Sequence, residues 1–325
     1  LTHHRLRPAA NRMSTPAPKP RTAPKARPAK QKAPIERVGM LGVGIMGLAM
    51  AVNLMKAGFQ VTGYDPDPKA MKRLKAAGGT TCKSAADLAG DAQVIICSLP
   101  GPEALHGAAQ QIAAVGQRGL LVVETSTLDI ADKTVARDTL KAQGIVMLDC
   151  PLSGTGAQAV HKDLTVYASG PKAAIQKLQP VFEGFSKNSF DLGAFGNGMK
   201  MKLMANLLVA IHNVSTAEAL LLGQRWGIQP KDAVKVLSDG AGGSRMLQIR
   251  GPLMEGEGWN TATMKVGIWQ KDMKLIAAAL ADAQVPAPLF AATVPVYNAA
   301  MALGHAEHDT AAVFDVLSRM SSGVS

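Results

Sequence analysis

Apolar and polar residues alternate in blocks along residues 37–192 of this chain. Short apolar runs of strand character occupy 37–41, 59–64, 93–98, 120–124, 145–149, 164–169 and 189–192, with a shorter segment around Thr80. Between them, apolar side chains recur at the three- and four-residue spacing of helices. This repeated alternation of apolar strands and helices predicts a parallel sheet that is covered by helices on both faces.

The strand pattern disappears from Gly198 onward. A long run of helical character at 199–226 ends at Gly227, and shorter helices are predicted at 230–239, 244–249, 268–283, 288–303 and 309–320. We therefore predict an α/β fold, in which a parallel-sheet domain at 35–197 precedes an all-α domain at 198–325.

Residues 1–34 differ in composition from the rest of the chain. They contain nine lysines and arginines, seven prolines and no acidic residue. The remaining residues hold 26 basic and 24 acidic side chains, so the net charge of +11 belongs mostly to this tail. A segment of this composition cannot bury a core, and we expect it to be disordered. The chain begins at Leu1, and Met13 is a candidate initiator.

The cysteines and histidines point to neither a disulfide framework nor a metal site. Cys82, Cys97 and Cys150 are odd in number and form no C-x-x-C pair, so we expect buried free thiols in a cytoplasmic protein. His305 and His308 lack ligand spacing and are expected on a solvated helix end. No uninterrupted apolar run reaches the roughly 18 residues of a membrane span, so none is predicted.

The first predicted strand runs directly into Gly42-x-Gly44-x-x-Gly47, and a helical pattern follows. The first glycine permits a tight turn, the second lets a pyrophosphate approach the backbone, and the third lets helix and strand pack closely. The helix start at Ile45 and Met46 supplies amide donors to phosphates. Together these residues predict a Rossmann-type dinucleotide site. A glycine-rich turn in another kind of α/β protein is the alternative.

Residues at the carboxyl ends of the other strands extend this predicted site. Asp65 ends the second strand, 18 residues after the third glycine of the loop, where a carboxylate accepts hydrogen bonds from the ribose 2′-OH of NAD. Leu99, Pro100 and Thr127 follow later strands. Ligands of open parallel sheets bind beyond the strand carboxyl ends, so we expect these residues to contact the cofactor.

Two polar residues lie four positions apart in the long predicted helix. At about 100° per residue, Lys202 and Asn206 share one face. The neighbouring residues are largely apolar, and this pattern favours a small buried polar site. A helix start with a lysine that extends to solvent is the alternative.

These segments together resemble the β-hydroxyacid dehydrogenases, the group of 3-hydroxyisobutyrate dehydrogenase and tartronate semialdehyde (2-hydroxy-3-oxopropionate) reductase. The resemblance covers roughly residues 36–320 in order. It rests on the glycine loop, Asp149-Cys150-Pro151-Leu152-Ser153-Gly154, Gly196-x-Gly198-x-x-x-Lys202-x-x-x-Asn206 and Lys271-Asp272. The longer 6-phosphogluconate dehydrogenases share this plan.

The resemblance implies a role for each matching residue. Lys202 would be the acid/base group, and Asn206 would orient the substrate. The loop of Ser153, Gly154 and Thr155 would hold a substrate carboxylate. Further cofactor contacts would come from Leu99, Pro100, Thr127 and Lys271.

Three positions depart from the family pattern. Thr155 stands where the family usually has a second glycine, and Lys162 stands where it often has the glycine of Gly-x-Leu. Leu207 follows Asn206, where the family often doubles the asparagine. These departures leave the substrate open.

The sequence therefore predicts hydride transfer between a nicotinamide cofactor and a small β-hydroxy carboxylate or its semialdehyde. NAD is the expected cofactor and NADP is less favoured. The resemblance also implies a homodimer or tetramer. The basic tail leaves a non-catalytic nucleic-acid or chromatin-type binding protein as one alternative, and an imine reductase on the same scaffold is another. Lys202 disfavours both, because relatives without this chemistry are expected to replace the lysine.

Overall fold

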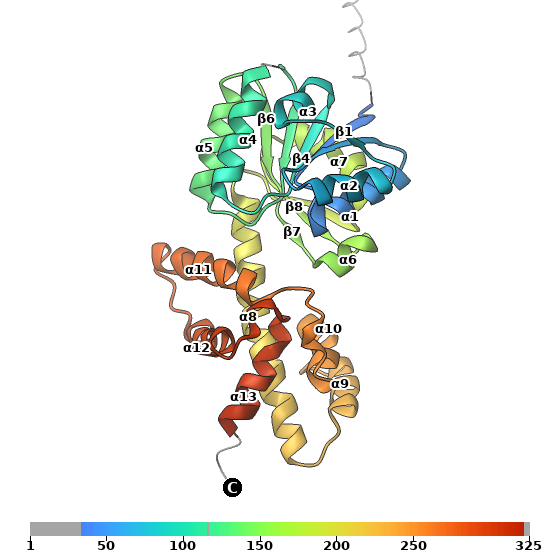
Figure 1. The fold of residues 1–325 in the computed structure, drawn as a ribbon. Helices are drawn as coiled ribbons and strands as arrows, with labels where there is room; N and C mark the ends of the chain where they lie inside the picture. Colours follow the sequence, from blue (N-terminus) through green and yellow to red (C-terminus); the bar gives the residue numbers. More distant parts are fainter. Residues whose placement is uncertain (1–33, 116, 322–325) are drawn as a thin grey trace, which may run out of the picture. The chain divides into compact units, whose positions relative to one another are not determined.

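The computed structural model describes residues 34–115 and 117–321 (Figure 1). The predicted disordered tail lies almost wholly outside this range, so its disorder stays a prediction. The described residues from Ile35 onward form one compact unit. The proposed domain division between 197 and 198 therefore also stays a prediction, although the change from strands to helices occurs there.

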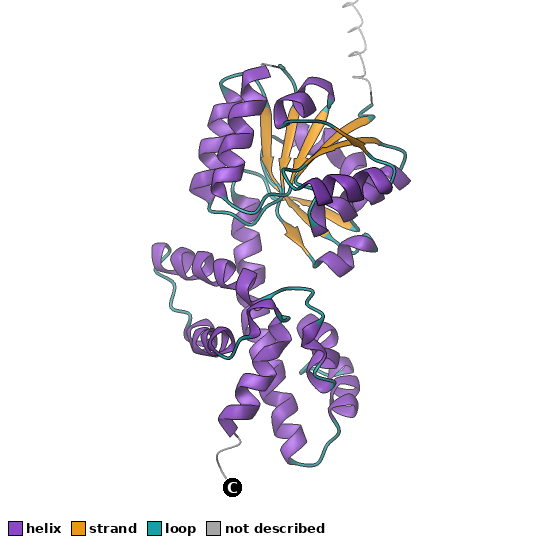
Figure 2. Ribbon diagram, in the orientation of Figure 1, coloured by secondary structure: helices purple, strands orange, loops and turns teal. Residues whose placement is uncertain are grey.

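A six-stranded parallel sheet forms the first part of the fold (Figure 2). Its strands follow the order β3-β2-β1-β4-β5-β6. The elements are β1 (Arg37–Leu41), α1 (Ile45–Lys56), β2 (Gln60–Tyr64), α2 (Pro68–Ala76), β3 (Thr80–Thr81), α3 (Ala85–Asp91), β4 (Val94–Cys97), α4 (Pro102–Val115), β5 (Leu121–Glu124), α5 (Ile130–Lys141) and β6 (Val146–Asp149). The chain order reverses direction at β1 and β4, which is where open parallel sheets bind ligands.

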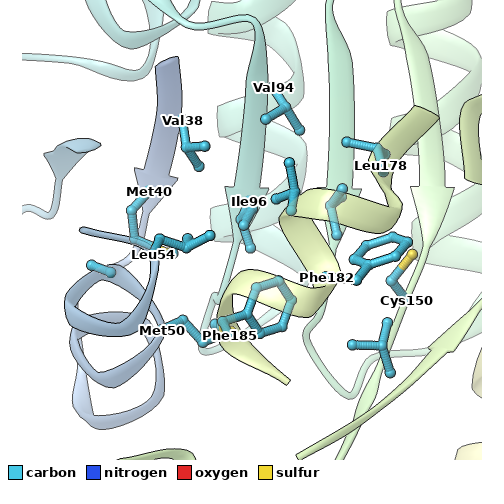
Figure 3. Close-up of a cluster of buried hydrophobic side chains, with 14 of the residues drawn as sticks. Val38, Met40, Met50, Leu54, Val94, Ile96, Cys150, Leu178, Phe182 and Phe185 are labelled. Atoms are coloured by element: carbon cyan, nitrogen blue, oxygen red, sulfur yellow. The ribbon is translucent and has the colours of Figure 1, made fainter. Parts of the chain in front are cut away.

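Both faces of this sheet are buried. Successive side chains of a strand point to opposite faces of the sheet, so each strand contributes to the packing on both. Val94 and Ile96 of β4 pack on the α1 side, with Phe182 of a later helix (Figure 3). Ile95 and Cys97 pack on the other side, against α3, α4 and α5. The prediction of a parallel sheet covered on both faces is therefore confirmed.

A second sheet of three strands was not predicted. It contains β7 (Leu152–Ser153), β8 (Thr165–Ala168) and β9 (Asn188–Asp191), together with α6 (Gly156–Val160) and α7 (Lys172–Phe185). The strands predicted at 164–169 and 189–192 occur as β8 and β9, which are parallel to each other but belong to this separate sheet and not to the six-stranded one, and β7 is antiparallel to β8. A two-residue strand is too short to show a period of two in the sequence.

The second part of the fold is built around one long helix, α8 (Asn197–Arg225). Around it pack α9 (Pro230–Asp239), α10 (Arg245–Glu255), α11 (Val266–Asp282), α12 (Pro288–Ala302) and α13 (Val313–Ser321), with short 3₁₀ turns η1 (Gly258–Asn260), η2 (His305–Glu307) and η3 (Thr310–Ala312). Trp269 and Tyr297 are buried within this group. The predicted fold class, an α/β part followed by helices, is confirmed.

Polar contacts explain why asparagine occurs deep in this helical core. Asn213 on α8 donates to the hydroxyl of Tyr297 at 3.1 Å and to the carbonyl of Thr310 at 2.8 Å. Buried amides are tolerated when they are hydrogen-bonded in this way. Asn213 thus joins α8 to α12 and η3.

Two local predictions in this part were wrong. The helix predicted to end at residue 249 continues through Pro252 to Glu255, because Met254 is buried against the core. His305 is not on a solvated helix end but is buried beside Trp259. Its ring contacts the ring of His308 and the carboxylate of Asp315, both at 2.8 Å.

By its length and mean hydropathy, α8 is long and apolar enough to cross a membrane. Of its most apolar segment, 39% is buried inside the structure. The central helix of a helical core has the same composition, because neighbouring helices cover it. The packing of α9 to α13 on α8 accounts for its buried apolar residues, whereas Met204, Leu208 and Leu222 on this helix are exposed.

Candidate functional site

A cavity of about 850 Å³ lies at the carboxyl ends of the central parallel strands. It continues to α8 and α11, so both parts of the fold contribute to its wall. The predicted site residues that line it are Gly42, Gly44, Ile45, Met46, Asp65, Leu99, Pro100, Thr127, Gly154, Thr155, Lys202 and Lys271. The structure therefore brings together, at one cavity, residues that are more than 200 positions apart in the chain.

The glycine loop has the backbone geometry that a dinucleotide requires. Gly42 has a φ of +85°, and a Cβ there would lie 2.1 Å from the carbonyl oxygen of Ser98. A Cβ on Gly44 would meet no atom within 4 Å, so this position opens into the cavity. A Cβ on Gly47 would lie 2.0 Å from the Gly42 carbonyl. Gly47 thus serves helix packing and does not line the cavity.

Asp65 fixes the shape of this loop from the next strand. Its carboxylate accepts hydrogen bonds from the backbone N–H of Val43 at 2.7 Å and of Asp67 at 2.8 Å. Asp65 also lines the cavity. The carboxylate therefore lies at the glycine loop, where the ribose of a bound dinucleotide belongs.

Contacts from the strand ends and from α11 close the wall opposite the glycine loop. The Leu99 N–H donates to the hydroxyl of Ser126 at 2.8 Å, which joins the loops after β4 and β5. The ammonium of Lys271 on α11 donates to the carbonyl of Thr127 and lies 3.3 Å from a carboxylate oxygen of Asp272. Lys271 thus ties the helical part of the fold to the sheet at the cavity.

A second cavity of about 580 Å³ adjoins the first. Gly154, Thr155, Lys202 and Met264 line both cavities, whereas Ser153 and Asn206 line only the second. Lys202 therefore lies at the junction between a cavity with the size and residues for a dinucleotide and a smaller cavity beyond it.

Burial sets the chemistry of Lys202. The residue is 8% exposed, and burial lowers the pKa of its amine, with the nearby charge of Lys271 acting in the same direction and that of Asp272 opposing it. Among the described residues, none forms a hydrogen bond or ion pair with this amine. A lysine of this kind can release and recover a proton closer to neutral pH than a solvated lysine.

Asn206 is held in place by a residue that the sequence analysis did not assign a role. Its amide N–H donates to Asp272 Oδ2 at 2.9 Å, and both side chains are buried. Asp272 thereby contacts Asn206 and Lys271 and influences Lys202. The Lys271-Asp272 pair was visible in the sequence, but only the fold shows that its carboxylate faces the lysine on α8.

The predicted carboxylate loop is shaped by its own helix. The Thr155 N–H donates to Gln158 Oε1 at 3.0 Å at the start of α6, so this backbone donor is already used. The Thr155 hydroxyl donates to the same oxygen at 3.4 Å, so the Ser153 hydroxyl and the Gly154 backbone N–H are the donors that the loop can offer to a ligand. This geometry supports the anion-binding role that the resemblance implied.

A buried charge cluster connects the strand ends to the start of α8. The Lys133 ammonium on α5 lies 2.7 Å from Glu124 Oε2 and 2.7 Å from Asp149 Oδ1, and all three residues are fully buried. These two carboxylates raise the pKa of the Lys133 ammonium against the effect of burial. Sequence reasoning missed this cluster, although Lys133 lies three and seven residues before Ala136 and Leu140, which are buried on the same face of α5.

The same cluster fixes the first turn of α8. Asp149 Oδ2 accepts a hydrogen bond from the Met199 N–H at 2.8 Å and one from the Ser169 hydroxyl at 3.1 Å. The Gly198 N–H donates to that hydroxyl at 2.9 Å. The cluster holds two carboxylates and one ammonium, so its net negative charge lies beside the N-terminal, positive end of the α8 dipole. The contacted residue, Met199, is three positions before Lys202.

Comparisons with known proteins agree with this site. Residues 37–219 match the NAD-binding domain of 6-phosphogluconate dehydrogenase, and residues 196–317 match the NAD-binding domain of NADP-dependent 3-hydroxyisobutyrate dehydrogenase. The two matches together cover every predicted site residue.

Individual relatives cover nearly the same range. The chain is 32% identical to L-threonate dehydrogenase of Cupriavidus necator over 86% of its own length and 95% of that protein. It is 29% identical to an NAD-dependent L-serine dehydrogenase of Pseudomonas aeruginosa over 86% of its length and 97% of that protein. A crystal structure of 3-hydroxyisobutyrate dehydrogenase from Salmonella typhimurium superposes with a TM-score of 0.78, at 28% identity, over 86% of this chain and 99% of that one.

Proposed function

Because the chain belongs to the β-hydroxyacid dehydrogenase family, we propose that it interconverts a small β-hydroxy carboxylate and its semialdehyde. The chain is an NAD-binding dehydrogenase that acts on a CH–OH group, as its named relatives are. The proposed substrates are acids of the 3-hydroxyisobutyrate or 2-hydroxy-3-oxopropionate type. Neither the nucleic-acid-binding alternative nor the imine reductase alternative is favoured.

The bound nicotinamide would accept the hydride from the alcohol carbon, or supply it to the aldehyde. Lys202 then has the task of moving the second hydrogen as a proton. In oxidation its neutral amine would take the proton of the substrate hydroxyl, and in reduction its ammonium would return a proton to the aldehyde oxygen. Ser153, Gly154 and Thr155 would hold the carboxylate, and Asn206 would orient the substrate beside Lys202.

One observation supports this proposal most strongly: the unpaired, buried Lys202 stands where the dinucleotide cavity meets a second, smaller cavity. The proposal predicts activity of the full chain with NAD on a panel of 3-hydroxyisobutyrate, glycerate and threonate, and with NADH on tartronate semialdehyde. NADH absorbance measures the reaction in both directions. No turnover of any member of the panel would overturn the proposal.

We expect the enzyme to prefer NAD to NADP. The Asp65 carboxylate lies at the glycine loop and would repel a 2′-phosphate. Pro66, which follows it, offers no charge to a phosphate. The measurement is kcat/KM for the two cofactors with one substrate, and Asp65→Ala should narrow the difference between them.

Asp67 provides a control for this comparison, since it caps α2 through the Lys69 N–H at 2.9 Å and does not line the cavity. Asp67→Ala should leave the cofactor ratio unchanged. A wild-type enzyme that used NADP more efficiently would show that the prediction is wrong.

We also propose that the protein is a dimer or a higher oligomer. Met204, Leu208, Leu222 and Trp226, on or next to α8, have exposed fractions of 61%, 51%, 50% and 71%. Covering such side chains in a partner subunit removes apolar surface from water. Light scattering at micromolar concentration should give a mass of at least twice 33.9 kDa.

The double variant Met204→Glu, Leu208→Glu is expected to shift this mass toward the monomer. The exposed Val135 on α5 is a control, because Val135→Glu changes an apolar residue of 55% exposure elsewhere. A monomeric wild-type protein would contradict the prediction.

A further inference from the structure

The second cavity, beyond Lys202, is strongly basic. Among its lining residues are Lys187, Lys202, Arg245 and Arg250, whereas Asp163 is the single acidic residue in that lining. Lys202 belongs to the proposed chemistry, and burial favours its neutral form. Arg250 is paired with the buried carboxylate of Asp309, so Lys187 and Arg245 against Asp163 leave the far part of the cavity with an excess of one positive charge.

Two of these cations share the carboxylate of Asp163. Arg245 Nη2 lies 3.2 Å from Asp163 Oδ2, and Lys187 Nζ lies 3.7 Å from Asp163 Oδ1. Their side chains remain 62% and 68% exposed. One carboxylate thus meets two cations that keep open sides toward the cavity and the solvent.

The third cation, Arg250, is buried and paired with a carboxylate, and one of its nitrogens faces only a weak acceptor. Arg250, on the helix that also carries Arg245, donates through Nε to Asp309 at 3.2 Å and to the Thr310 hydroxyl at 2.7 Å. Its Nη1 faces the sulfur of Met246 at 3.0 Å, and a thioether is only a weak acceptor. An oxyanion in the cavity would offer this guanidinium a much stronger partner.

A substrate with a single carboxylate leaves these cations unused. The loop of Ser153, Gly154 and Thr155 accounts for one carboxylate, and this loop adjoins Lys202. Arg245, Met246, Ile249 and Arg250 line the same cavity from α10, at the three- and four-residue spacings of one helix face. The basic residues therefore lie where the chain of a longer substrate would extend.

We propose that this cavity selects hydroxy acids that carry a second anionic group, with Arg245 and Lys187 binding that group. The inference rests on the proposed function and narrows its substrate class to dianions. A terminal carboxylate and a phosphate share the chemistry that such a basic site recognises.

Asp163 gives the site a second property that can be tested. Its carboxylate competes with the substrate anion for Arg245 and Lys187, so removal of its charge should favour dianions. An asparagine would keep an oxygen acceptor for the Gln158 amide, which donates to Asp163 Oδ2 at 3.1 Å. Asp163→Asn can therefore remove the charge while preserving the support of Thr155 by Gln158.

The experiment compares matched substrates that differ by one anionic group. One pair is threonate and threonate 4-phosphate, and the other is 2-(hydroxymethyl)pentanoate and 2-(hydroxymethyl)glutarate. The wild-type enzyme with NAD should show a higher kcat/KM for the dianion of at least one pair, through a lower KM. The pair that shows the preference identifies phosphate or carboxylate as the group that is bound.

Opposite effects are expected from the two variants. Arg245→Gln should lower kcat/KM for the preferred dianion about tenfold and leave its monoanionic partner unchanged, since charged hydrogen bonds contribute modestly at exposed sites. Asp163→Asn should raise kcat/KM for the dianion, by roughly threefold. If the ion pair only held the cavity in shape, both variants would instead lower activity on monoanions and dianions alike.

A matched control is Arg319→Gln, because Arg319 is also 62% exposed and also pairs with one aspartate, Asp315, at 2.9 Å. The Arg319→Gln variant should leave kcat/KM unchanged for both members of each pair. Calorimetric binding of each acid to the NADH complex provides a readout that does not need turnover. Equal kcat/KM and equal affinity within both pairs would overturn the subsite alone, whereas no turnover of any substrate would overturn the proposed function.

Discussion

Lys202→Ala is expected to lower kcat by roughly 10²- to 10⁴-fold, the contribution of a well-placed general acid–base group. The amine is buried at the junction of the two cavities and, among the described residues, has no hydrogen-bond partner. It therefore is free to exchange a proton with a substrate oxygen. Steady-state kinetics would measure the loss, and the dissociation constant for NADH should change little because the glycine loop is untouched.

Two further variants test the position and the chemistry of this lysine. Lys200 lies about 200° around α8 from Lys202 and is exposed, so Lys200→Ala should be close to wild type. Lys202→Arg should lower kcat as Lys202→Ala does, because a guanidinium does not release its proton near neutral pH. Near-normal turnover of Lys202→Ala would refute the proposed mechanism.

The pH dependence gives an independent measure of the same group. Burial lowers the pKa of Lys202, and Asp272 opposes this effect. Oxidation needs the neutral amine, so its kcat/KM should rise with pH, with a midpoint below that of an ordinary lysine. Asp272→Asn removes the negative charge and should move this midpoint to lower pH. A midpoint that did not move would indicate that another group controls the profile.

Lys133→Met is expected to destabilise the protein by about 3 to 5 kcal/mol, the typical effect of removing one partner from a buried ion pair. Glu124 and Asp149 would then be left fully buried without their cation. Asp149 also binds the first turn of α8, so part of the loss should be local to that helix. Urea unfolding would measure the change in the free energy of unfolding.

Controls separate the charge effect from general damage to α5. Lys141 lies on the same helix and is exposed, so Lys141→Met should change stability by less than about 0.5 kcal/mol. Adding Glu124→Gln and Asp149→Asn to Lys133→Met removes the uncompensated charges and should recover part of the loss. Wild-type stability of Lys133→Met alone would contradict the prediction.

The contribution of Lys133 should persist across the neutral range. Its carboxylate partners raise the pKa of the ammonium above the value in the unfolded chain. The stabilisation is therefore fully present below the unfolded pKa of lysine and is lost only as pH rises through the higher folded value. Urea unfolding of the wild type in alkaline buffer would follow this loss.

Features that follow from short-range pattern were predictable from the amino-acid sequence. Apolar runs separated by helical spacing specify buried parallel strands and their helices, because the periods of 2 and 3.6 residues are local properties. Gly42 and Gly47 specify their loop, because the positive φ of Gly42 and the close backbone contacts at both positions exclude a side chain, whereas Gly44 leaves space toward the cavity. The predicted cofactor contacts except Gly47 accordingly line one cavity.

Contacts between polar residues could not be predicted from local pattern. His305 was expected on a solvated helix end and Lys133 had no predicted role, yet His305 is buried beside Trp259 and Lys133 lies between two carboxylates. Arg245 and Asp163 are 82 residues apart and become partners only through the fold. Burial and pairing depend on contacts between distant segments, and the free energy of placing a charge depends on those contacts and not on its neighbours in the chain.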